Sequence, residues 1–446
     1  MFSRLGNRQT DSLRDERIGT KLEELNMQNR VFPEHSSVWK VLEEQLRELR
    51  SQDLSHRMGQ FFFFWRKPGD AIQLAAKEAA SMFFNQLFIG ELKQPSGAKL
   101  ADDIEQMTLE ILSAPANAKC TLTSGGTESN FWAVKIARDR AREKQPQISV
   151  PEIIVPMSAH PSFEKAGHFL GVKTVRTPLG EDKRADVKAM AETINENTIL
   201  VAGSSPCYPY GLCDPVVEIA KLAQTNALWC HVDACVGGFI IPFLKKLGRD
   251  IPDFDFSVPG VNSIAADLHK YGYTPPGMST FSLRDRADYC YQIFDWKSSQ
   301  WNGAGDYQTE TLAGSRATDV LASAWTTMMM LGEEGYLKAA RGLLETMERL
   351  KAGIAAIDGL EVAFEPEVAL FLFTSRQYDI IAVAEEMTNR GYPTAWYELD
   401  HPVMHLLLDP LEDERHLEDY LEMLAAVAQD VADGKVKRSG EGAVYA

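Results

Sequence analysis

The segment AADLHKYGYTPPG, residues 265–277, places a lysine directly after a histidine, between the end of an apolar strand and a turn rich in glycine and proline. A lysine at a partly dry strand end, beside a cationic or hydrogen-bonding neighbour, can lose its proton and form a Schiff base with an aldehyde. Lys270 is therefore a candidate covalent anchor for pyridoxal phosphate. The alternative is a solvated surface pair, the commoner setting for a histidine next to a lysine.

A glycine turn further upstream suits a phosphate group. TSGGTES, residues 123–129, follows a short apolar stretch and opens an amphipathic run at residues 131–141, so it indicates a strand, a turn and a helix N-terminus. Free backbone N–H groups and the helix dipole favour an anion there. Gly126 lets the backbone approach closely, and the Thr127 hydroxyl can donate a hydrogen bond. An ordinary glycine turn with Ser and Thr caps is the alternative.

Two more candidates follow predicted strands. Asp233 ends an apolar strand in WCHVDACVGGF, where a carboxylate can pair with the pyridine nitrogen of the cofactor and keep it protonated. His160, in SAHPSFEKAG, follows the apolar stretch at residues 153–156 and can stack on the pyridine ring. Taken singly, Asp233 also suits a helix cap and His160 a polar loop. All four segments fall at strand ends, where open α/β sheets bind ligands.

Together these motifs resemble the pyridoxal-dependent group that includes sphingosine phosphate lyase and the group II amino-acid decarboxylases. GSSPCYPYGLCDP, ETLAGSR and the C-terminal GEGAVYA make the lyase branch, in its soluble bacterial type, the closer match, from about Lys99 onward. The resemblance implies roles for a set of residues: Lys270 as Schiff-base lysine, Asp233 as pyridinium partner, His160 as stacking ring, Gly126, Thr127 and His269 as phosphate contacts, Ser315 as a phosphate contact from the neighbouring subunit, and Tyr208 and Tyr445 on the substrate side.

The sequence departs from the lyases on the substrate side. After KYGYTP the lyases carry a lysine, and this chain has Pro276, which has neither a charge nor a backbone donor. An Asn and a His of the lyases correspond to Asn85 and Phe88 in FFNQLF. The substrate is therefore either a phosphorylated amino alcohol or a molecule without the phosphate.

The resemblance implies a pyridoxal-dependent carbon-carbon lyase that cleaves an amino alcohol by a retro-aldol reaction into an aldehyde and an amine. Decarboxylation of an amino acid is the runner-up, with Arg316 as a candidate to bind a carboxylate. A scaffold that kept the fold without activity is a third possibility. The fold implied is α/β, fold type I, and the assembly is a homodimer with active sites at the subunit interface.

Composition limits the class of protein. A chain of 446 residues with 45% hydrophobic content can bury a substantial core. Its net charge of -17 argues against nonspecific binding to nucleic acid or anionic lipid. The six cysteines show no CxxC or zinc-like spacing, so we expect a reducing cytoplasm and no metal site. We find no signal peptide and no apolar run long enough to span a bilayer, so we expect a soluble protein.

We expect three parts along the chain. Residues 1–98 form an N-terminal segment with a helix at residues 37–50 and the aromatic run FFFFW at residues 61–65, which suits a dimer contact or the substrate entrance. Residues 99–332 form a large cofactor-binding domain with a mostly parallel, seven-stranded type of sheet. Residues 333–446 form a small α+β domain, with strands expected at 360–364, 369–374 and 403–408.

Overall fold

The computed structural model describes residues 36–51, 69–88, 94–301, 305–392, 394–410 and 415–438. Contacts divide the chain into two units, Met1–Arg57 and Met58–Ala446, which are described separately. The first unit contains helix α2 (Trp39–Ser51), which confirms the helix predicted at residues 37–50. The aromatic run at residues 61–65 and Tyr445 lie outside the described residues.

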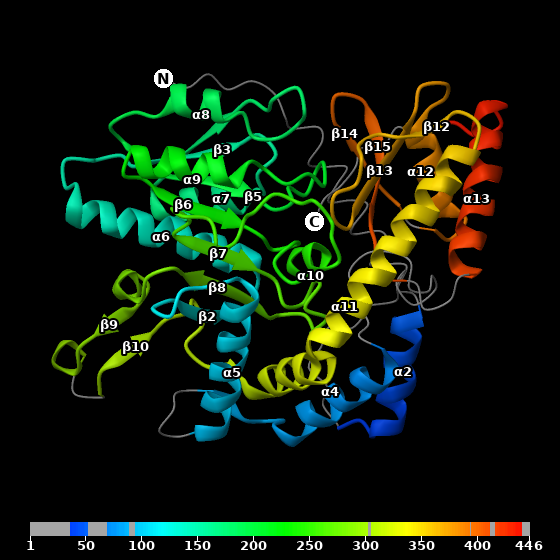
Figure 1. Ribbon diagram of the computed structural model, residues 1–446. Helices are drawn as coiled ribbons and strands as arrows, with labels where there is room; N and C mark the ends of the chain where they lie inside the picture. Colours follow the sequence, from blue (N-terminus) through cyan, green and yellow to red (C-terminus); the bar gives the residue numbers. More distant parts are fainter. Residues whose placement is uncertain are drawn as a thin grey trace. The chain divides into compact units, whose positions relative to one another are not determined.

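Seven strands form the central sheet of the second unit, in the spatial order β2-β8-β7-β6-β5-β3-β4 (Figure 1). Their bounds are β2 (Lys119–Thr123), β3 (Glu152–Pro156), β4 (Lys173–Thr177), β5 (Thr198–Ser204), β6 (Trp229–Asp233), β7 (Ser263–Ala266) and β8 (Ser279–Leu283). Strand β8 is antiparallel to β2 and β7, whereas β7, β6, β5, β3 and β4 pair in parallel. The expected mostly parallel, seven-stranded sheet is confirmed.

Helices cover both faces of this sheet, because side chains alternate from face to face along a strand. In β3, Ile153 and Val155 belong to one buried cluster, together with side chains of α6 and α7. Ile154, between them, belongs to the other cluster. The bounds of the helices in these two layers are α5 (Pro95–Ile111), α6 (Gly126–Lys144), α7 (Ser162–Leu170), α8 (Val187–Thr193), α9 (Val216–Thr225) and α10 (Ile241–Lys246).

The parallel strands end at one edge of the sheet, and the sequence candidates follow those ends. Gly126 follows β2, His160 follows β3, and Tyr208 follows β5. Asp233 is the last residue of β6, and Lys270 lies four residues after the end of β7. The topology therefore gathers these five segments at the carboxyl edge, as expected for an open α/β sheet.

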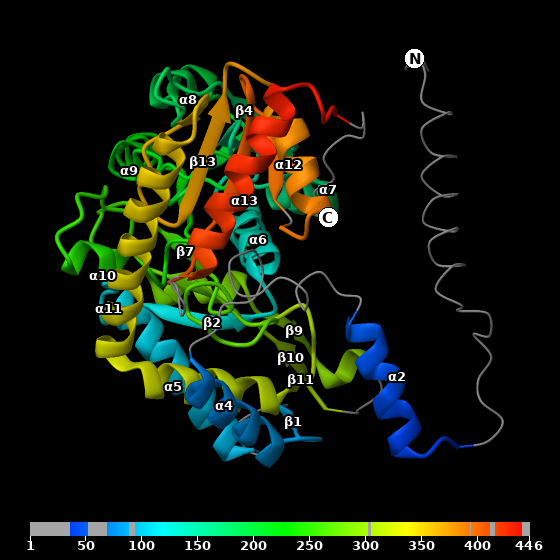
Figure 2. The same ribbon diagram turned by 90° about the vertical axis from the view of Figure 1, so that its right-hand side faces the viewer.

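A second sheet of four antiparallel strands, in the order β12-β13-β15-β14, lies toward the end of the chain (Figure 1). Figure 2 shows its strand β13 with the helices α12 and α13. Its strands and helices are β12 (Leu360–Val362), β13 (Leu370–Ser375), β14 (Ala395–Glu398), β15 (Pro402–Leu407), α12 (Ile380–Asn389) and α13 (Arg415–Ala432). Three of these strands were predicted from the sequence, and β14 was missed. The domain boundaries at residues 98 and 332 stay a prediction.

Helix α11 (Thr318–Ala356) connects the two sheets. It breaks at Gly332, whose φ of 52° and ψ of -174° are not helical. Helix α4 (Asp70–Met82) packs along α11. Among the described residues, no helix is both long and apolar enough to cross a lipid bilayer.

Two short ribbons complete the second unit. Strand β1 (Leu87–Phe88) pairs with β11 (Arg316–Ala317), so the segment after α4 lies beside the AGSR segment. Strands β9 (Phe294–Trp296) and β10 (Tyr307–Thr309) form a hairpin that extends from the sheet in Figure 1. Short 3-10 turns cover Arg286–Tyr291 and Ser298–Gln300.

Candidate active site

Lys270 lies opposite a buried carboxylate. Its Nζ is 2.9 Å from Oδ2 of Asp267, which directly follows β7 and is 3% exposed. Burial opposes the charged form of the lysine, but Asp267 outweighs it, so the pKa of Lys270 is raised. The sequence suggested a cationic or hydrogen-bonding neighbour for Lys270, whereas the structure places a buried carboxylate beside it, which stabilises the charged amine. The deciding neighbour is an acid three residues upstream, not a cation.

Asp233 is held as a carboxylate at the end of β6. It is 7% exposed, its Oδ2 accepts a hydrogen bond of 2.8 Å from Asn130 Nδ2, and its Oδ1 accepts one of 3.1 Å from the Cys235 backbone N–H. Burial opposes ionisation, but the nearby His160 ring and the two donors outweigh it, so the pKa of Asp233 is lowered. The carboxylate stays charged although little water reaches it.

A chain of buried hydrogen bonds fixes Asn130 behind this carboxylate. The Asn130 Oδ1 atom lies 2.9 Å from His231 Nε2, and His231 Nδ1 lies 2.8 Å from the Ser263 hydroxyl. Burial lowers the pKa of His231 to about 4, so its ring is neutral at neutral pH. With Asn130 accepting, the neutral ring carries its proton on Nε2 and accepts at Nδ1 from Ser263.

His160 follows β3 and shares the electrostatic environment of Asp233 and Lys270. Its Nδ1 accepts a hydrogen bond of 3.1 Å from the Ser162 backbone N–H. Burial lowers the pKa of His160, and the attraction of Asp233 does not cancel that effect. A neutral, partly buried imidazole beside the carboxylate can therefore pack against a flat ligand ring.

Residue 126, at the N-terminus of α6, lies so close to two neighbouring side chains that only glycine fits there. A Cβ at Gly126 would lie 2.4 Å from Cys235 Sγ and 3.0 Å from Asp267 Oδ1, closer than real contacts allow. Ser124 and Thr127 are exposed there. A Cβ at Gly125 would lie 4.0 Å from Cε1 of His269, so this ring borders the same helix end. Helix N-termini of this kind bind phosphate.

Glu128, in the first turn of α6, connects this helix end to the AGSR segment. Its Oε2 accepts hydrogen bonds of 2.8 Å and 2.7 Å from the backbone N–H and the hydroxyl of Ser124. Its Oε1 accepts one of 2.9 Å from the Leu312 backbone N–H. Ser315, three residues later, is exposed. The segment that carries Ser315 is thus hydrogen-bonded to the first turn of α6.

The predicted substrate contacts are spread more widely. Asn85 is exposed, with a φ of 69°, and precedes β1, so it lies near the AGSR ribbon. The ring of Tyr208 lies 4.8 Å from that of His405, and its hydroxyl lies 3.5 Å from that of Tyr397. Tyr208 therefore contacts the small sheet. Pro276 is exposed in the loop that follows Lys270.

Arg316 forms a hydrogen bond and an ion pair with residues of its own chain. Its guanidinium donates a hydrogen bond of 2.8 Å to the Leu122 carbonyl and lies 3.4 Å from Glu310 Oε1. It also lies 5.0 Å from the centre of the Phe88 ring. These contacts give Arg316 and Phe88 a structural role within the chain. An arginine already paired with Glu310 is less suited to be the carboxylate receptor that a decarboxylase requires.

Comparisons with known proteins show the family of the chain. A family model described as the pyridoxal-dependent decarboxylase conserved domain matches residues 22–376. The chain belongs to this family. Pyridoxal phosphate is therefore its cofactor, and the residues present fit it. The α6 N-terminus with its glycine cradle suits the phosphate, the buried Asp233 carboxylate suits a protonated ring nitrogen, and Lys270 suits an aldehyde.

Several relatives in this family are lyases. The sphingosine-1-phosphate lyase of Arabidopsis thaliana is 40% identical over 322 residues, which are 71% of this chain and 58% of the plant protein. The chain thus spans about three fifths of that relative's length. The solved structure of a Burkholderia pseudomallei sphingosine-1-phosphate lyase superposes with a TM-score of 0.83 at 31% identity, covering 91% of this chain and 94% of that one.

A decarboxylase is also among the relatives. The probable L-tyrosine/L-aspartate decarboxylase of Methanothermobacter thermautotrophicus is 33% identical over 329 residues, which are 74% of this chain and 87% of that protein. The relatives of this chain thus include proteins named as lyases and a protein named as a decarboxylase.

Four residues of this site were missed by the sequence analysis: Asp267, Asn130, His231 and Glu128. Asp267 could have been suspected, because an acid three residues before a lysine can reach it within one turn. Asn130 stands directly after the quoted TSGGTES motif, but its partner Asp233 is more than a hundred residues away. Nothing in the sequence around His231 or Glu128 indicated that these residues would contact the site.

Proposed function

We propose that this protein is a pyridoxal-phosphate-dependent carbon-carbon lyase that cleaves an amino alcohol, by a retro-aldol reaction, into an aldehyde and an amine. The observation that carries the proposal is the ionised, buried Asp233 at the end of β6, beside the ring of His160 and near Lys270. A buried carboxylate that hydrogen bonds keep charged can pair with a cation that enters the site, and a protonated pyridine nitrogen is such a cation.

In the proposed site each group has one task. Lys270 anchors the cofactor, Asp233 holds the proton on its ring nitrogen, and His160 packs against the ring. Gly126, Thr127 and His269 bind its phosphate. When bound, pyridoxal phosphate supplies an electron sink at the carbon that bears the substrate's amino group.

Proton movements fall to Lys270 and Tyr208. Lys270 Nζ would be the group that returns a proton to the amine-bearing carbon of the substrate. Asp267, 2.9 Å from Nζ, favours the charged ammonium that such a donor needs. Tyr208 is the second candidate donor, and its contacts with Tyr397 and His405 hold its ring at the small sheet. Tyr445 is proposed as a further substrate contact.

The lyase reaction is preferred over decarboxylation because of Arg316. Its hydrogen bond to the Leu122 carbonyl and its ion pair with Glu310 already use part of the charge and donors that a carboxylate substrate would need. The similarity to lyases of a plant and a bacterium supports the same choice. Decarboxylation of an amino acid without a phosphate stays the second candidate, because an archaeal relative at 33% identity is named a decarboxylase.

The active unit we propose is a homodimer in the cytoplasm. Ser315 and Asn85 are both exposed, and they flank the two strands of the β1–β11 ribbon. A partner subunit would bring both residues to the cofactor phosphate and the substrate of the other copy. The free cysteines are consistent with a reducing compartment.

A product assay tests the proposal. The cofactor-loaded protein is incubated with dihydrosphingosine phosphate, with dihydrosphingosine and with a panel of free amino acids, and the products are identified by mass spectrometry. The blank is Lys270→Ala, and its matched control is Lys221→Ala, an exposed lysine on α9. A long-chain aldehyde establishes the lyase. Its formation from the free base alone would assign a non-phosphorylated substrate, and amines from amino acids without aldehyde would overturn the proposal in favour of the decarboxylase.

A further inference from the structure

The loop at residues 205–215, between β5 and α9, carries Tyr208 and is fixed at its base by buried hydrogen bonds. Asp214 is fully buried. Its carboxylate accepts a hydrogen bond of 2.7 Å from the Ser204 backbone N–H and one of 2.8 Å from the Ala185 backbone N–H. The base of the Tyr208 loop is therefore held firmly against the end of β5.

Strand β15 brings His405 to the same loop. His405 is fully buried, and its Nε2 lies 2.9 Å from the backbone carbonyl oxygen of Tyr208. A carbonyl oxygen only accepts hydrogen bonds, so the His405 ring carries a proton on Nε2. Burial lowers the pKa of His405 to about 4, so the ring is neutral at neutral pH and this bond uses its single N–H. His405 thus holds the backbone of Tyr208 and, at 4.8 Å between ring centres, its side chain as well.

Strand β14 adds a hydroxyl group from the same face of the small sheet. Ala395 of β14 stands opposite His405 of β15 in the antiparallel pair. Tyr397, two residues after Ala395, therefore points to the same side as His405. The ring centre of Tyr397 lies 5.0 Å from that of His405 and 6.2 Å from that of Tyr208. The Tyr397 hydroxyl donates to the Tyr208 hydroxyl oxygen at 3.5 Å.

Strand β15 also reaches the loop that carries Lys270. Tyr271 is fully buried, and its hydroxyl donates a hydrogen bond of 2.5 Å to the carbonyl of Leu408, directly after β15. His405 lies three residues earlier in the same strand. One strand therefore contacts the loops of both residues that could donate a proton, Lys270 and Tyr208.

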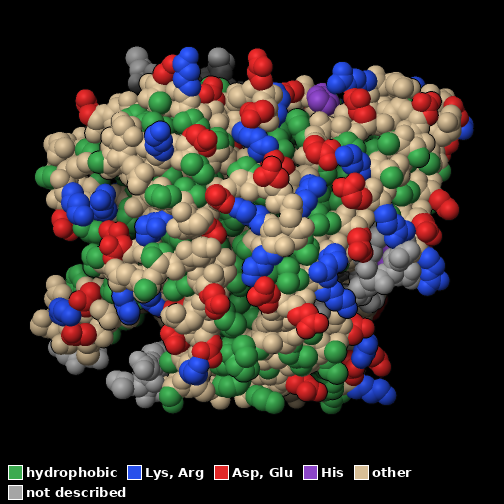
Figure 3. Space-filling model, in the orientation of Figure 1, with side chains coloured by type: hydrophobic (Ala, Val, Ile, Leu, Met, Phe, Trp, Pro, Cys, Tyr) green, Lys and Arg blue, Asp and Glu red, His purple; other side chains and the backbone are tan. Residues whose placement is uncertain are grey.

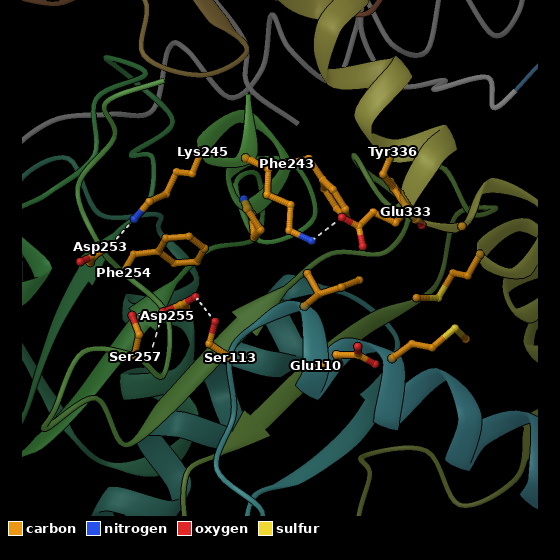
Figure 4. A pocket seen from close by; sticks show the side chains of 16 residues that line it. Glu110, Ser113, Phe243, Lys245, Asp253, Phe254, Asp255, Ser257, Glu333 and Tyr336 are labelled. Atoms are coloured by element: carbon orange, nitrogen blue, oxygen red, sulfur yellow. Dashed lines mark hydrogen bonds and ion pairs between the residues drawn. The ribbon is translucent and has the colours of Figure 1, made fainter. Parts of the chain in front are cut away.

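Helix α11 fixes the small sheet to the central sheet. The pocket in Figure 4 shows Tyr336 of α11 beside Phe243 of α10, with ring centres 4.9 Å apart and 13° between the planes. The Tyr336 hydroxyl also donates to the Gly272 carbonyl, two residues after the candidate Schiff-base lysine, at 3.1 Å. Lys246 Nζ lies 2.7 Å from Glu333 Oε1, and Figure 3 shows acidic and basic side chains together over this region. Because α11 also packs against β12 and α13, the small sheet keeps one position relative to the central sheet.

We propose that His405 and Tyr397 are positioning residues for Tyr208, His405 through the backbone of Tyr208 and Tyr397 through its hydroxyl. The inference rests on the proposed function, in which Tyr208 gives a proton to the amine-bearing carbon of the substrate. In that step the O–H bond of Tyr208 breaks, a C–H bond forms, and an electron pair stays on the Tyr208 oxygen. Tyr397 then donates to an anion, and hydrogen bonds to a charged oxygen are shorter and stronger. The separation of 3.5 Å before reaction leaves room for this tightening.

A pair of tyrosine variants tests the role of Tyr397. Tyr397→Phe removes the hydroxyl and keeps the ring. With the cofactor-loaded protein and the substrate found by the product assay, kcat should fall about tenfold and KM should change less than about twofold, because the bond strengthens only in the transition state. In a Tyr208→Phe background the same substitution should cause no further loss, because both residues act through one proton transfer.

The matched control is Tyr378→Phe, which removes a hydroxyl that donates to the Asp358 carbonyl at 3.0 Å, and it should keep the wild-type kcat. A tenfold loss from Tyr397→Phe in both backgrounds would overturn the role of Tyr397. A Tyr208→Phe variant as active as the wild type would overturn the inference and leave the lyase reaction standing.

Backbone hydrogen exchange tests His405 without any turnover, on the cofactor-loaded protein without substrate. His405→Leu removes the donor to the Tyr208 carbonyl, so exchange of the peptide at residues 205–215 should speed up about fivefold. His405→Gln keeps an N–H at the end of the side chain and should restore most of the protection. Thr374→Val removes a hydroxyl that donates to the Pro402 carbonyl at 2.7 Å in the same sheet, and this matched control should leave the loop unchanged.

The histidine variants are also assayed for turnover. His405→Leu should lower kcat about fivefold, and His405→Gln should restore it, because a displaced proton donor slows the reaction. Equal exchange in His405→Leu and Thr374→Val, or an unchanged kcat in His405→Leu, would overturn the role of His405. Absence of aldehyde in the product assay would overturn the proposed function instead, and the exchange comparison would still decide whether His405 holds the Tyr208 loop.

Discussion

Asn130 and Asp233 are joined by a hydrogen bond of 2.8 Å from Asn130 Nδ2 to Asp233 Oδ2. Asn130 lies in the first turns of α6, and Asp233 ends β6, so the bond connects the N-terminal part of this helix to the end of the strand. A second bond, between Asn130 Oδ1 and His231 Nε2, prevents the amide from rotating. The carboxylate is thus oriented before any ligand arrives.

Replacing Asn130 with leucine should destabilise the protein. The variant leaves Oδ2 of the buried Asp233 and the His231 N–H without the partners that Asn130 supplies, and a hydrogen bond to a charged group contributes about 1.5–3 kcal/mol. We therefore expect the free energy of unfolding to fall by about that amount in urea titrations of the cofactor-free protein. Asn226→Leu, at an exposed helix end, is the control and should cost less than about 1 kcal/mol. Equal losses in the two variants would show that Asn130 has no special role.

Replacing Asp267 with asparagine should allow the cofactor to load at lower pH. Covalent attachment needs the neutral amine of Lys270, and Asp267 raises the pKa of that amine. Without the carboxylate the pKa falls, so the rise of the loading rate with pH should shift to lower pH. The rate is followed by the absorbance of the bound cofactor at a series of pH values. Asp306→Asn, an exposed acid, should keep the wild-type profile, and an unshifted profile in Asp267→Asn would contradict this account.

Gly126 and Gly125 make a matched pair of neighbouring substitutions. Alanine at residue 126 would place its Cβ 2.4 Å from Cys235 Sγ, whereas alanine at residue 125 would come no closer than 4.0 Å to His269. Forcing an atom into a packed site costs about 1–3 kcal/mol. We expect that loss in the unfolding free energy of Gly126→Ala, without cofactor, and a much smaller change in Gly125→Ala. Similar values for both would mean that Cys235 moves aside easily.

The sequence allowed us to predict those site residues that stand in a recognisable short motif. A glycine turn before a helix, an aspartate at a strand end and a lysine in a short loop are each visible within a few residues, and the sheet topology then gathers Gly126, Asp233 and Lys270 at one edge. The parallel sheet itself was predictable because its strands are buried on both faces and so appear as short apolar runs.

The residues that position these groups were not predictable in the same way. Asn130 matters because α6 passes beside the end of β6, and Glu128 matters because the chain returns to it at Leu312. Both facts depend on tertiary contacts between distant segments. The raised pKa of Lys270 was missed because Asp267 was not recognised as the partner of Nζ. Strand β14 was missed because it is only four residues long and none of them is fully buried.

His231 should make the stability of the protein depend on pH. Burial lowers its pKa to about 4, whereas the unfolded chain has a histidine pKa of about 6.5. The unfolded chain therefore takes up the proton first, and stability is lost as the pH falls from about 6.5 toward 4. Each pKa unit corresponds to about 1.4 kcal/mol, so His231 should remove about 2 kcal/mol between pH 7 and pH 5.

The comparison that isolates this effect is between wild type and His231→Gln, each unfolded in urea at about pH 7 and about pH 5. Buried acids act in the opposite direction: burial raises the pKa of Glu105 to about 7, so its contribution grows as the pH falls. That contribution is common to both proteins and cancels in the difference. The wild type should lose about 2 kcal/mol more than the variant between these two pH values, as estimated from the shift of one buried histidine. His168→Gln, at an exposed ring, should retain the wild-type loss, and an identical loss in His231→Gln would show that His231 takes up no proton on unfolding.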